Sequence, residues 1–149
     1  MICSYCQTET ENTETCDFCK ADLTAARPEV NPDLSELDVN RTQPELMRLH
    51  TFDLMRLLRH IRDERSKSYR IMQLVRKTPD EAKKEELNEF GQQFYRDLTA
   101  KQNVIEQILV DRMGYYPQRV DGKLLSALTN KIERCVQNEQ KTRRGQASK

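Results

Sequence analysis

The chain has 149 residues, a length that allows one domain or one domain with a small additional module. Hydrophobic residues make up 36% of it and charged residues 33%, with four glycines and no tryptophan. This composition favours long, solvated helices over a compact α/β fold. The 25 basic and 24 acidic side chains nearly cancel, which argues against a partner held by overall charge alone.

No stretch of 18 apolar residues occurs, so the sequence predicts no membrane-spanning helix. The first residues also lack a basic segment followed by an apolar run, and we therefore expect no signal peptide. Together these features predict a cytoplasmic protein, in which cysteine thiols stay reduced.

The charges alternate in blocks along the chain. Residues 1–45 carry 3 basic and 10 acidic side chains, and residues 46–77 carry 9 and 3. Residues 78–113 carry 5 and 8, and residues 114–149 carry 8 and 3. Neighbouring blocks of opposite sign favour antiparallel packing of successive elements.

Four of the five cysteines lie in the first 23 residues as two C-x-x-C pairs, Cys3 with Cys6 and Cys16 with Cys19. Two such pairs can supply the four thiolates of one tetrahedral Zn²⁺ site. A closed shell of four cysteines leaves no position for water or substrate, so the predicted zinc, one per chain, is structural.

Two disulfides or a redox C-x-x-C are the alternatives to zinc. Disulfides need an oxidising compartment, and a thioredoxin-like motif needs a βαβ context that the sequence lacks. The module also has too few apolar residues to fold without a metal, which must then supply the folding free energy. The apolar residues in question are Ile2, Tyr5, Phe18 and Leu23.

Residues 16–23 (C-D-F-C-K-A-D-L) resemble the second half of the short bacterial zinc-ribbon domains, which typically end C-x-x-C-G-A-x-L. The resemblance covers residues 1–23 and implies that the four cysteines are the metal ligands. Gln7 and Lys20 stand where that family usually has glycine. Such ribbons are attached to many unrelated bodies, so the resemblance constrains function weakly.

Residues 24–41 contain two prolines, several acidic residues and isolated apolar ones, a pattern typical of a flexible acidic linker. The segment is either a plain spacer or a docking segment that packs on the helical body or on a partner. In the second case the docking residues are Leu34, Leu37 and Val39.

Thr42 and Glu45 form a capping-box pattern that predicts the start of a helix running to about Lys77. The polar segment Arg62–Arg70 interrupts its apolar stripe, but no glycine or proline interrupts the helix, so we expect it to be continuous. The stripe consists of Met47, Leu54, Leu57, Leu58, Ile61, Met72 and Val75.

Thr78, Pro79 and Glu81 predict the start of a second helix, which ends at Met113 with Gly114 after it. Two helices of about 34 residues joined by a tight turn must form a long antiparallel hairpin. The predicted stripe of the second helix is Leu87, Phe90, Phe94, Leu98, Val104, Ile105, Ile108 and Leu109.

Tyr115 and Tyr116 are expected to pack over the end of that helix. Asp121 then caps a third, shorter helix to about Gln140, on whose apolar stripe Cys135 is expected to be buried. The helical domain thus covers 42–140, and 141–149 is a basic, flexible tail. The stripe of the third helix is Leu124, Leu125, Leu128, Ile132, Cys135 and Val136. The predicted fold is mostly α, with the zinc ribbon at its N-terminus.

We find no phosphate-binding loop, nucleophile elbow or metalloprotease motif. His50 and His60 have no acid, base or metal partner positioned by the sequence and are expected at the surface. The sequence therefore predicts neither an enzyme nor a small-molecule substrate.

The function predicted is that of a zinc-ribbon adaptor or regulator, which binds a macromolecular partner, in the first place a protein, through its ribbon and amphipathic helices. A second copy of the chain is the simplest such partner. The alternative is a DNA- or RNA-binding regulator that uses an arginine-rich helix and the basic tail. Its candidate contacts are Arg56, Arg59, Arg62, Arg143 and Arg144.

Overall fold

The computed structural model describes residues 1–3, 8–18, 20–25 and 28–147, with only the backbone of Glu139. The chain divides into two compact units, Met1–Gln118 and Arg119–Lys149. The described residues are mostly helical, which confirms the predicted class. The helices of the first unit are the 3₁₀-helix η1 (Glu36–Asn40), α1 (Gln43–Leu46), α2 (Thr51–Arg76) and α3 (Glu81–Met113), and the second unit contains α4 (Gly122–Ala147).

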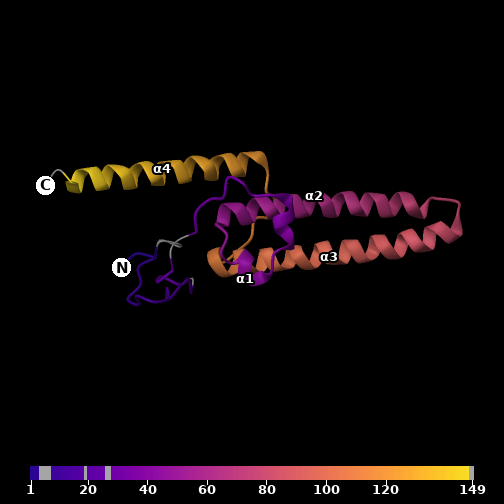
Figure 1. Ribbon diagram of the computed structural model, residues 1–149, viewed down its shortest axis with the longest axis horizontal. Coiled ribbons are helices and arrows are strands. Elements are labelled where there is room, and N and C mark those ends of the chain that lie inside the picture. The colour runs from indigo at the N-terminus through magenta and orange to yellow at the C-terminus, as the bar shows by residue number, and fades with distance from the viewer. Residues whose placement is uncertain (4–7, 19, 26–27, 148–149) are drawn as a thin grey trace. The chain divides into compact units, whose positions relative to one another are not determined.

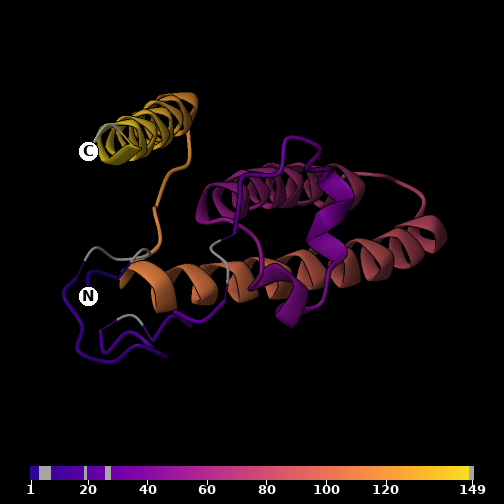
Figure 2. The ribbon, with the colours of Figure 1, turned by 60° about the vertical axis from the view of Figure 1, so that its left-hand side comes forward.

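The predicted helical hairpin is confirmed. α2 and α3 run antiparallel and pack against each other along their length, joined by a short turn (Figures 1 and 2). Arg62 of α2 forms an ion pair with Glu106 of α3, with 3.1 Å between Nη2 and Oε1. The basic and acidic blocks of the two arms therefore meet at this pair, as the alternation of charge predicts.

The single helix expected from Thr42 to Lys77 is wrong in its first part. Thr42 does begin a helix, and its N–H donates to Glu45 Oε2 at 3.1 Å, but α1 ends after one turn and α2 begins only at Thr51. His50 caps α2 by accepting a hydrogen bond at Nδ1 from the N–H of Phe52 (3.0 Å).

The break before α2 is stabilised by a residue from the far end of the hairpin. The guanidinium of Arg112, in the last turn of α3, donates to the carbonyl oxygens of Leu49 (2.7 Å) and Met47. These are carbonyls that a continuous helix would have satisfied internally. Local helix propensity could not predict this contact, because Arg112 and Leu49 are more than 60 positions apart in the sequence.

α2 is unbroken from Arg62 to Arg70, as predicted. The cap of α3 differs from the prediction: Asp80, not Thr78, accepts from a helical N–H, that of Lys83, at 3.4 Å. The predicted end of α3 is confirmed, since Gly114 takes the left-handed conformation (φ 80°) and donates to the carbonyl of Val110 at 2.7 Å.

Part of the predicted linker docks on the hairpin. Val39 of η1 is buried, η1 contacts α2, and the N–H of Asn31 donates to Oδ2 of the buried Asp53 at 2.9 Å. Leu37, by contrast, is 75% exposed. Hydrogen bonds from Ser35 N–H and Arg41 stabilise the Asp38 carboxylate, which lowers its pKa and fixes both ends of η1.

The hairpin has an apolar core only in the half nearest α1. Large side chains from both arms are buried there, while the half nearest the turn has few buried apolar residues. The core residues of the two arms are Leu54, Leu57, Leu58, Ile61, Leu98, Ile105, Ile108 and Leu109.

The stripe predicted for the outer half of α3 is not the surface that packs on α2. Leu87, Phe90 and Phe94 are 49%, 73% and 44% exposed. The positions that are covered lie one residue further along, and one residue turns a helix by about 100°. From the turn inward, the half-buried or buried positions of α3 are Lys84, Asn88, Gly91, Tyr95 and Leu98, and those of α2 are Val75, Met72, Ser68 and Arg65.

Asp121 begins α4 as predicted, accepting from the N–H of Leu124 at 2.9 Å. α4 continues to Ala147, beyond the predicted end at Gln140, and with 26 residues it is as long as α2. Cys135 is exposed, so its predicted burial is wrong. Tyr115 is 62% exposed, whereas Tyr116 lies under the guanidinium of Arg62, 6.0 Å from Cζ to the ring centroid.

Replacing Gly91 with valine should destabilise the hairpin. A Cβ at Gly91 would lie 3.1 Å from Met72 Cγ, so the larger side chain forces the arms apart. We expect the free energy of unfolding, measured by urea titration of helical circular dichroism, to fall by about 1–3 kcal/mol. Gly145→Val is the matched control, since nothing lies within 4 Å of a Cβ there. Replacing glycine with valine improves helix propensity by itself, so an equal loss of stability in Gly145→Val would show that the close approach of the arms does not set the effect.

Candidate functional site

The N-terminal module consists of two short hairpins with the same hydrogen bonds. In the first, Cys3 N–H donates to Thr8 O (2.9 Å) and Thr10 N–H to Met1 O (2.9 Å). In the second, the residues thirteen positions later repeat both bonds: Cys16 N–H donates to Ala21 O (2.9 Å) and Leu23 N–H to Glu14 O (2.8 Å). Isolated bridges between Ile2 and Glu9 and between Thr15 and Asp22 follow the same shift.

Cys3 and Cys16 occupy the same place in these two hairpins and are completely buried in one cluster, against which Ala21 and Leu23 pack. Ile2 and Phe18, which the sequence offered as apolar core residues, are 66% and 71% exposed. Buried thiols therefore take the place of an apolar core in the described part of this module.

The described residues fit a metal centre without completing it. Cys6 and Cys19 lie outside them, so of the four predicted ligands the structure places only Cys3 and Cys16. Within the described ranges no group of three or more His, Cys, Asp or Glu side chains could hold a metal.

Lys20 has the left-handed backbone that the zinc-ribbon pattern requires of its glycine. Its φ is 58°, and its N–H donates to Cys16 O at 2.9 Å, closing the tight turn that follows Cys16. A residue with a Cβ adopts this conformation at a cost of about 1–2 kcal/mol. At Lys20 the departure from glycine therefore leaves the left-handed conformation in place, whereas Gln7 lies outside the described residues.

One polar contact that the sequence did not reveal joins the two hairpins. The buried Thr10 donates from Oγ1 to Asp17 Oδ2 (2.6 Å) and accepts from Asp17 N–H (3.2 Å). The hydrogen bond from Thr10 lowers the pKa of Asp17 below its usual value. A threonine and an aspartate seven residues apart match no recognisable motif, so the contact is visible only in the folded structure.

Two of the five arginines predicted as partner contacts are held within the first unit. Arg56 lies 3.5 Å from Asp53 Oδ1, and its Nη1 donates to Asn31 O at 3.4 Å. Arg62 donates to the carbonyls of Pro117 (2.8 Å) and Gln118 (3.2 Å) besides its ion pair with Glu106. The remaining three, Arg59, Arg143 and Arg144, are exposed.

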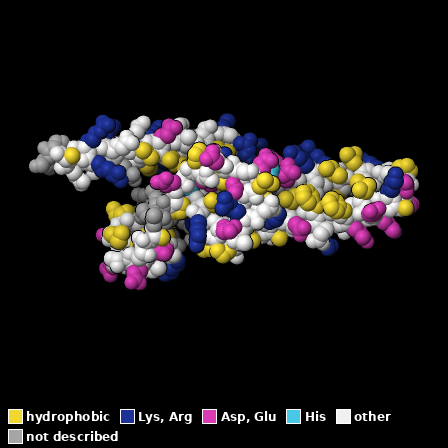
Figure 3. All heavy atoms as spheres, viewed as in Figure 1, with side chains coloured by type: hydrophobic (Ala, Val, Ile, Leu, Met, Phe, Trp, Pro, Cys, Tyr) yellow, Lys and Arg dark blue, Asp and Glu magenta, His cyan; other side chains and the backbone are white. Residues whose placement is uncertain are grey.

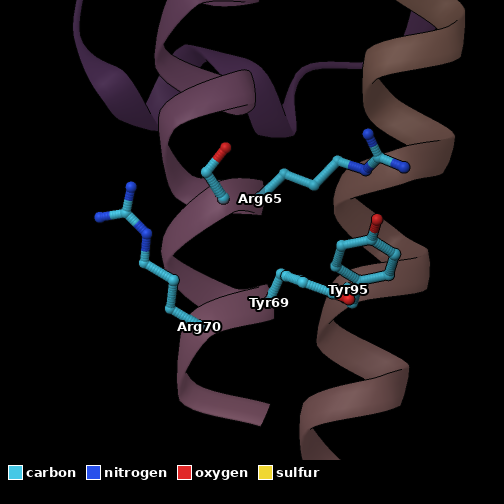
Figure 4. Close-up of a pocket in the computed structure, with 5 residues that line it drawn as sticks. Arg65, Tyr69, Arg70 and Tyr95 are labelled. Carbon is cyan, nitrogen blue, oxygen red and sulfur yellow. The ribbon is translucent and has the colours of Figure 1, made fainter. Parts of the chain in front are cut away.

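A shallow hollow of about 350 Å³ opens beside the hairpin at Arg65, Ser66, Tyr69, Arg70 and Tyr95. Figure 4 shows Tyr69 and Tyr95 turned toward each other between the arms, while Arg70 points away from them. The guanidinium of Arg65 covers the Tyr95 ring at 4.7 Å and donates to Thr99 Oγ1 at 3.0 Å. Arg65 thus bridges the two arms at a position where an apolar residue would be usual. The five residues that line the hollow do not include the paired acid and base that proton-transfer chemistry needs.

Exposed apolar side chains gather over the half of the hairpin nearest its turn (Figure 3). Each precedes a covered position by one residue: Ile71 and Leu74 precede Met72 and Val75, as Leu87, Phe90 and Phe94 precede Asn88, Gly91 and Tyr95. Because the arms are antiparallel, the same offset turns both sets to one side. The outer apolar face is defined as Ile71, Leu74, Leu87, Phe90 and Phe94.

No helix among the described residues is long and apolar enough to cross a membrane.

Replacing Lys20 with glycine should stabilise the second hairpin of the N-terminal module, and replacing it with valine should weaken it. Glycine adopts φ 58° without strain, but it also loses more backbone entropy on folding than lysine does. As the net of these two effects, we expect amide hydrogen exchange at Cys16 and Leu23 to slow about two- to fivefold. In Lys20→Val the same amides should exchange faster. Glu11→Gly is the control, since Lys20 is the only described non-glycine residue with a positive φ. Slower exchange in the control variant would contradict this assignment.

Comparison of the chain with protein-family models, with curated proteins and with solved structures returned no significant match. The function of the chain is therefore inferred from its own residues.

Proposed function

We propose that this chain is a non-enzymatic adaptor with a structural zinc ribbon, which binds a protein partner through its amphipathic helices. The observation that carries the proposal is the outer apolar face. Five large apolar side chains are 44–73% exposed on one side of the hairpin, next to an interface between the arms that has mostly polar side chains and a glycine. Apolar surface concentrated in this way marks sites of interaction in water-soluble proteins.

The ribbon contributes a rigid module rather than a reaction. Cys3, Cys6, Cys16 and Cys19 would hold one Zn²⁺, which when bound supplies folding free energy to a segment with almost no apolar core. The repeated hairpins, the two buried thiols at equivalent places and the left-handed Lys20 support this assignment.

The positions of the histidines support a role without catalysis. His50 caps α2, and His60 lies 3.7 Å from the exposed carboxylate of Glu36. The His50 contact begins a helix, and the His60 contact joins α2 to η1, so both described contacts connect parts of the fold.

Nucleic acid is the weaker candidate for the partner. Arg56 and Arg62 already bind carboxylates and carbonyl oxygens of the chain itself, and Arg65 covers a tyrosine ring. A guanidinium held in this way has fewer N–H groups left for phosphate. Exposed basic residues remain at Arg59 and in α4. We propose a protein partner because the outer apolar face supports it.

The zinc assignment predicts the effect of Cys3→Ser. Elemental analysis of wild-type protein should find one zinc per chain, and the variant should retain little, because a serine hydroxyl is a poor ligand in a site of four thiolates. Protection of the Leu23 amide should be lost, while helical circular dichroism should barely change, since the described helices lie within residues 36–147. Cys135→Ser is the matched control and should keep its zinc. A zinc-free wild type, or thiols joined in disulfides, would refute the assignment.

The adaptor proposal predicts the effect of Leu74→Gln on capture of a partner. Tagged wild-type protein should retain a defined protein from lysate, and Leu74→Gln should retain several-fold less, because Leu74 is 66% exposed on the outer apolar face. Leu37→Gln is the matched control: Leu37 is 75% exposed but lies on η1. Equal capture by all three proteins, or none by wild type, would count against the proposal.

A further inference from the structure

We propose that the outer apolar face is occupied by the same face of a second copy of this chain. The two copies are related by a two-fold axis that runs along the hairpin, so that α2 of each packs on α3 of the other and the four arms form a bundle. This inference rests on the proposed function and names one partner at the face that carries it.

The size of the face suits a dimer. With roughly 200 Å² for a fully exposed large side chain, the exposed fractions of its five residues correspond to about 600 Å² of accessible surface per copy. That is the upper end of what a monomer leaves exposed, about 300–600 Å². It is also most of the ~800 Å² that each partner buries in a standard interface.

The charges beside the face are of opposite sign on the two arms. On α2, Lys67 lies four residues before Ile71, and Arg70 lies four before Leu74, so both basic side chains border the face. Lys67 also forms an ion pair with Glu64 of its own helix, with 3.0 Å between Nζ and Oε1, so Glu64 is the acidic exception on this border. On α3, Glu86 lies four residues before Phe90, and Asp97 lies three after Phe94. All four are exposed, and Lys83, beside the turn, is the exception to the acidic border of α3.

These charges distinguish between the two possible two-fold arrangements. An axis across the hairpin would place α2 on α2 and α3 on α3, with like charges opposed. An axis along the hairpin places α2 on the partner's α3 and sets Lys67 level with the partner's Asp97, twice by symmetry. Opposed like charges are unfavourable, so the second arrangement is selected.

The same axis also aligns the apolar side chains of the two copies along the length of the hairpin. A rotation about an axis along the hairpin leaves every residue at its own level. Within one chain Met72 meets Gly91, with 3.1 Å between Met72 Cγ and an ideal Cβ, and the rings of Tyr69 and Tyr95 are 6.3 Å apart. Ile71 and Leu74 therefore lie level with residues 87–94, and in the dimer they meet the partner's leucine and phenylalanines.

The test is a pair of charge-reversed variants. Variant one carries Lys67→Glu and Arg70→Glu, and variant two carries Glu86→Lys and Asp97→Lys. Sedimentation equilibrium at 1–100 μM should show wild-type dimers, and each variant alone should dimerise at least tenfold more weakly, because both of its interhelical borders are then like-charged. An equimolar mixture should regain a dimer that contains one chain of each variant, since each border again has opposite charges.

The control is Lys131→Glu with Arg134→Glu in α4, which makes the same change of charge in the second unit, on neither arm of the hairpin, and should leave dimerisation unchanged. A dimer between variant one and wild type that is tighter than the wild-type dimer would overturn the arrangement, because it indicates α2 on α2. Monomeric wild type at 100 μM would overturn the dimer itself.

Two further readouts separate this inference from the adaptor proposal. A monomeric wild type that loses its captured protein on Leu74→Gln refutes the dimer and leaves the adaptor standing. A monomeric wild type whose melting temperature falls on Leu74→Gln refutes the dimer in favour of cover by the chain's own residues. A dimer that passes the mixing test supports the inference even if no other protein is captured, and the adaptor proposal alone then fails.

Discussion

The packing of α2 on α3 determines most of what the first unit presents to solvent. Its inner half is a conventional interface of leucine and isoleucine, closed by the ion pair of Arg62 and Glu106. In its outer half Arg65, Ser68, Asn88 and Gly91 stand where an apolar interface would have large aliphatic side chains. The arms meet there through a glycine and an arginine that covers a tyrosine ring, and the large apolar residues are left on one side.

The sequence was sufficient to predict the class, the antiparallel hairpin, the end of α3 at Gly114 and the cap of α4 at Asp121, because each depends on local spacing or on one capping residue. It was insufficient where a contact with a residue distant in the sequence determines where a helix begins or which of its faces is buried. The break before α2 depends on Arg112, and the exposure of Phe90 depends on which face of α3 meets α2. Periodicity finds the apolar face of a helix, but it does not show whether that face is the one covered.

The candidate site divides in the same way. The spacing of the cysteines predicted a metal module, and the described backbone is consistent with it, since the two hairpins share their hydrogen bonds and Lys20 takes the conformation of a glycine. The Thr10–Asp17 contact and the hollow beside Arg65 were not foreseen, because both depend on residues that approach only after folding. The buried positions of Cys3 and Cys16 indicate how little apolar surface is needed when thiols form the centre of a module.

The hydrogen bond between Asn31 and Asp53 limits how far the first 23 residues can travel. Seven residues lie between Leu23, the last residue of the second hairpin, and Asn31, so the eight steps of chain from one to the other span at most ~28 Å. Leu23 therefore stays within this distance of Asn31 and the start of α2, whatever the amino-terminal module binds.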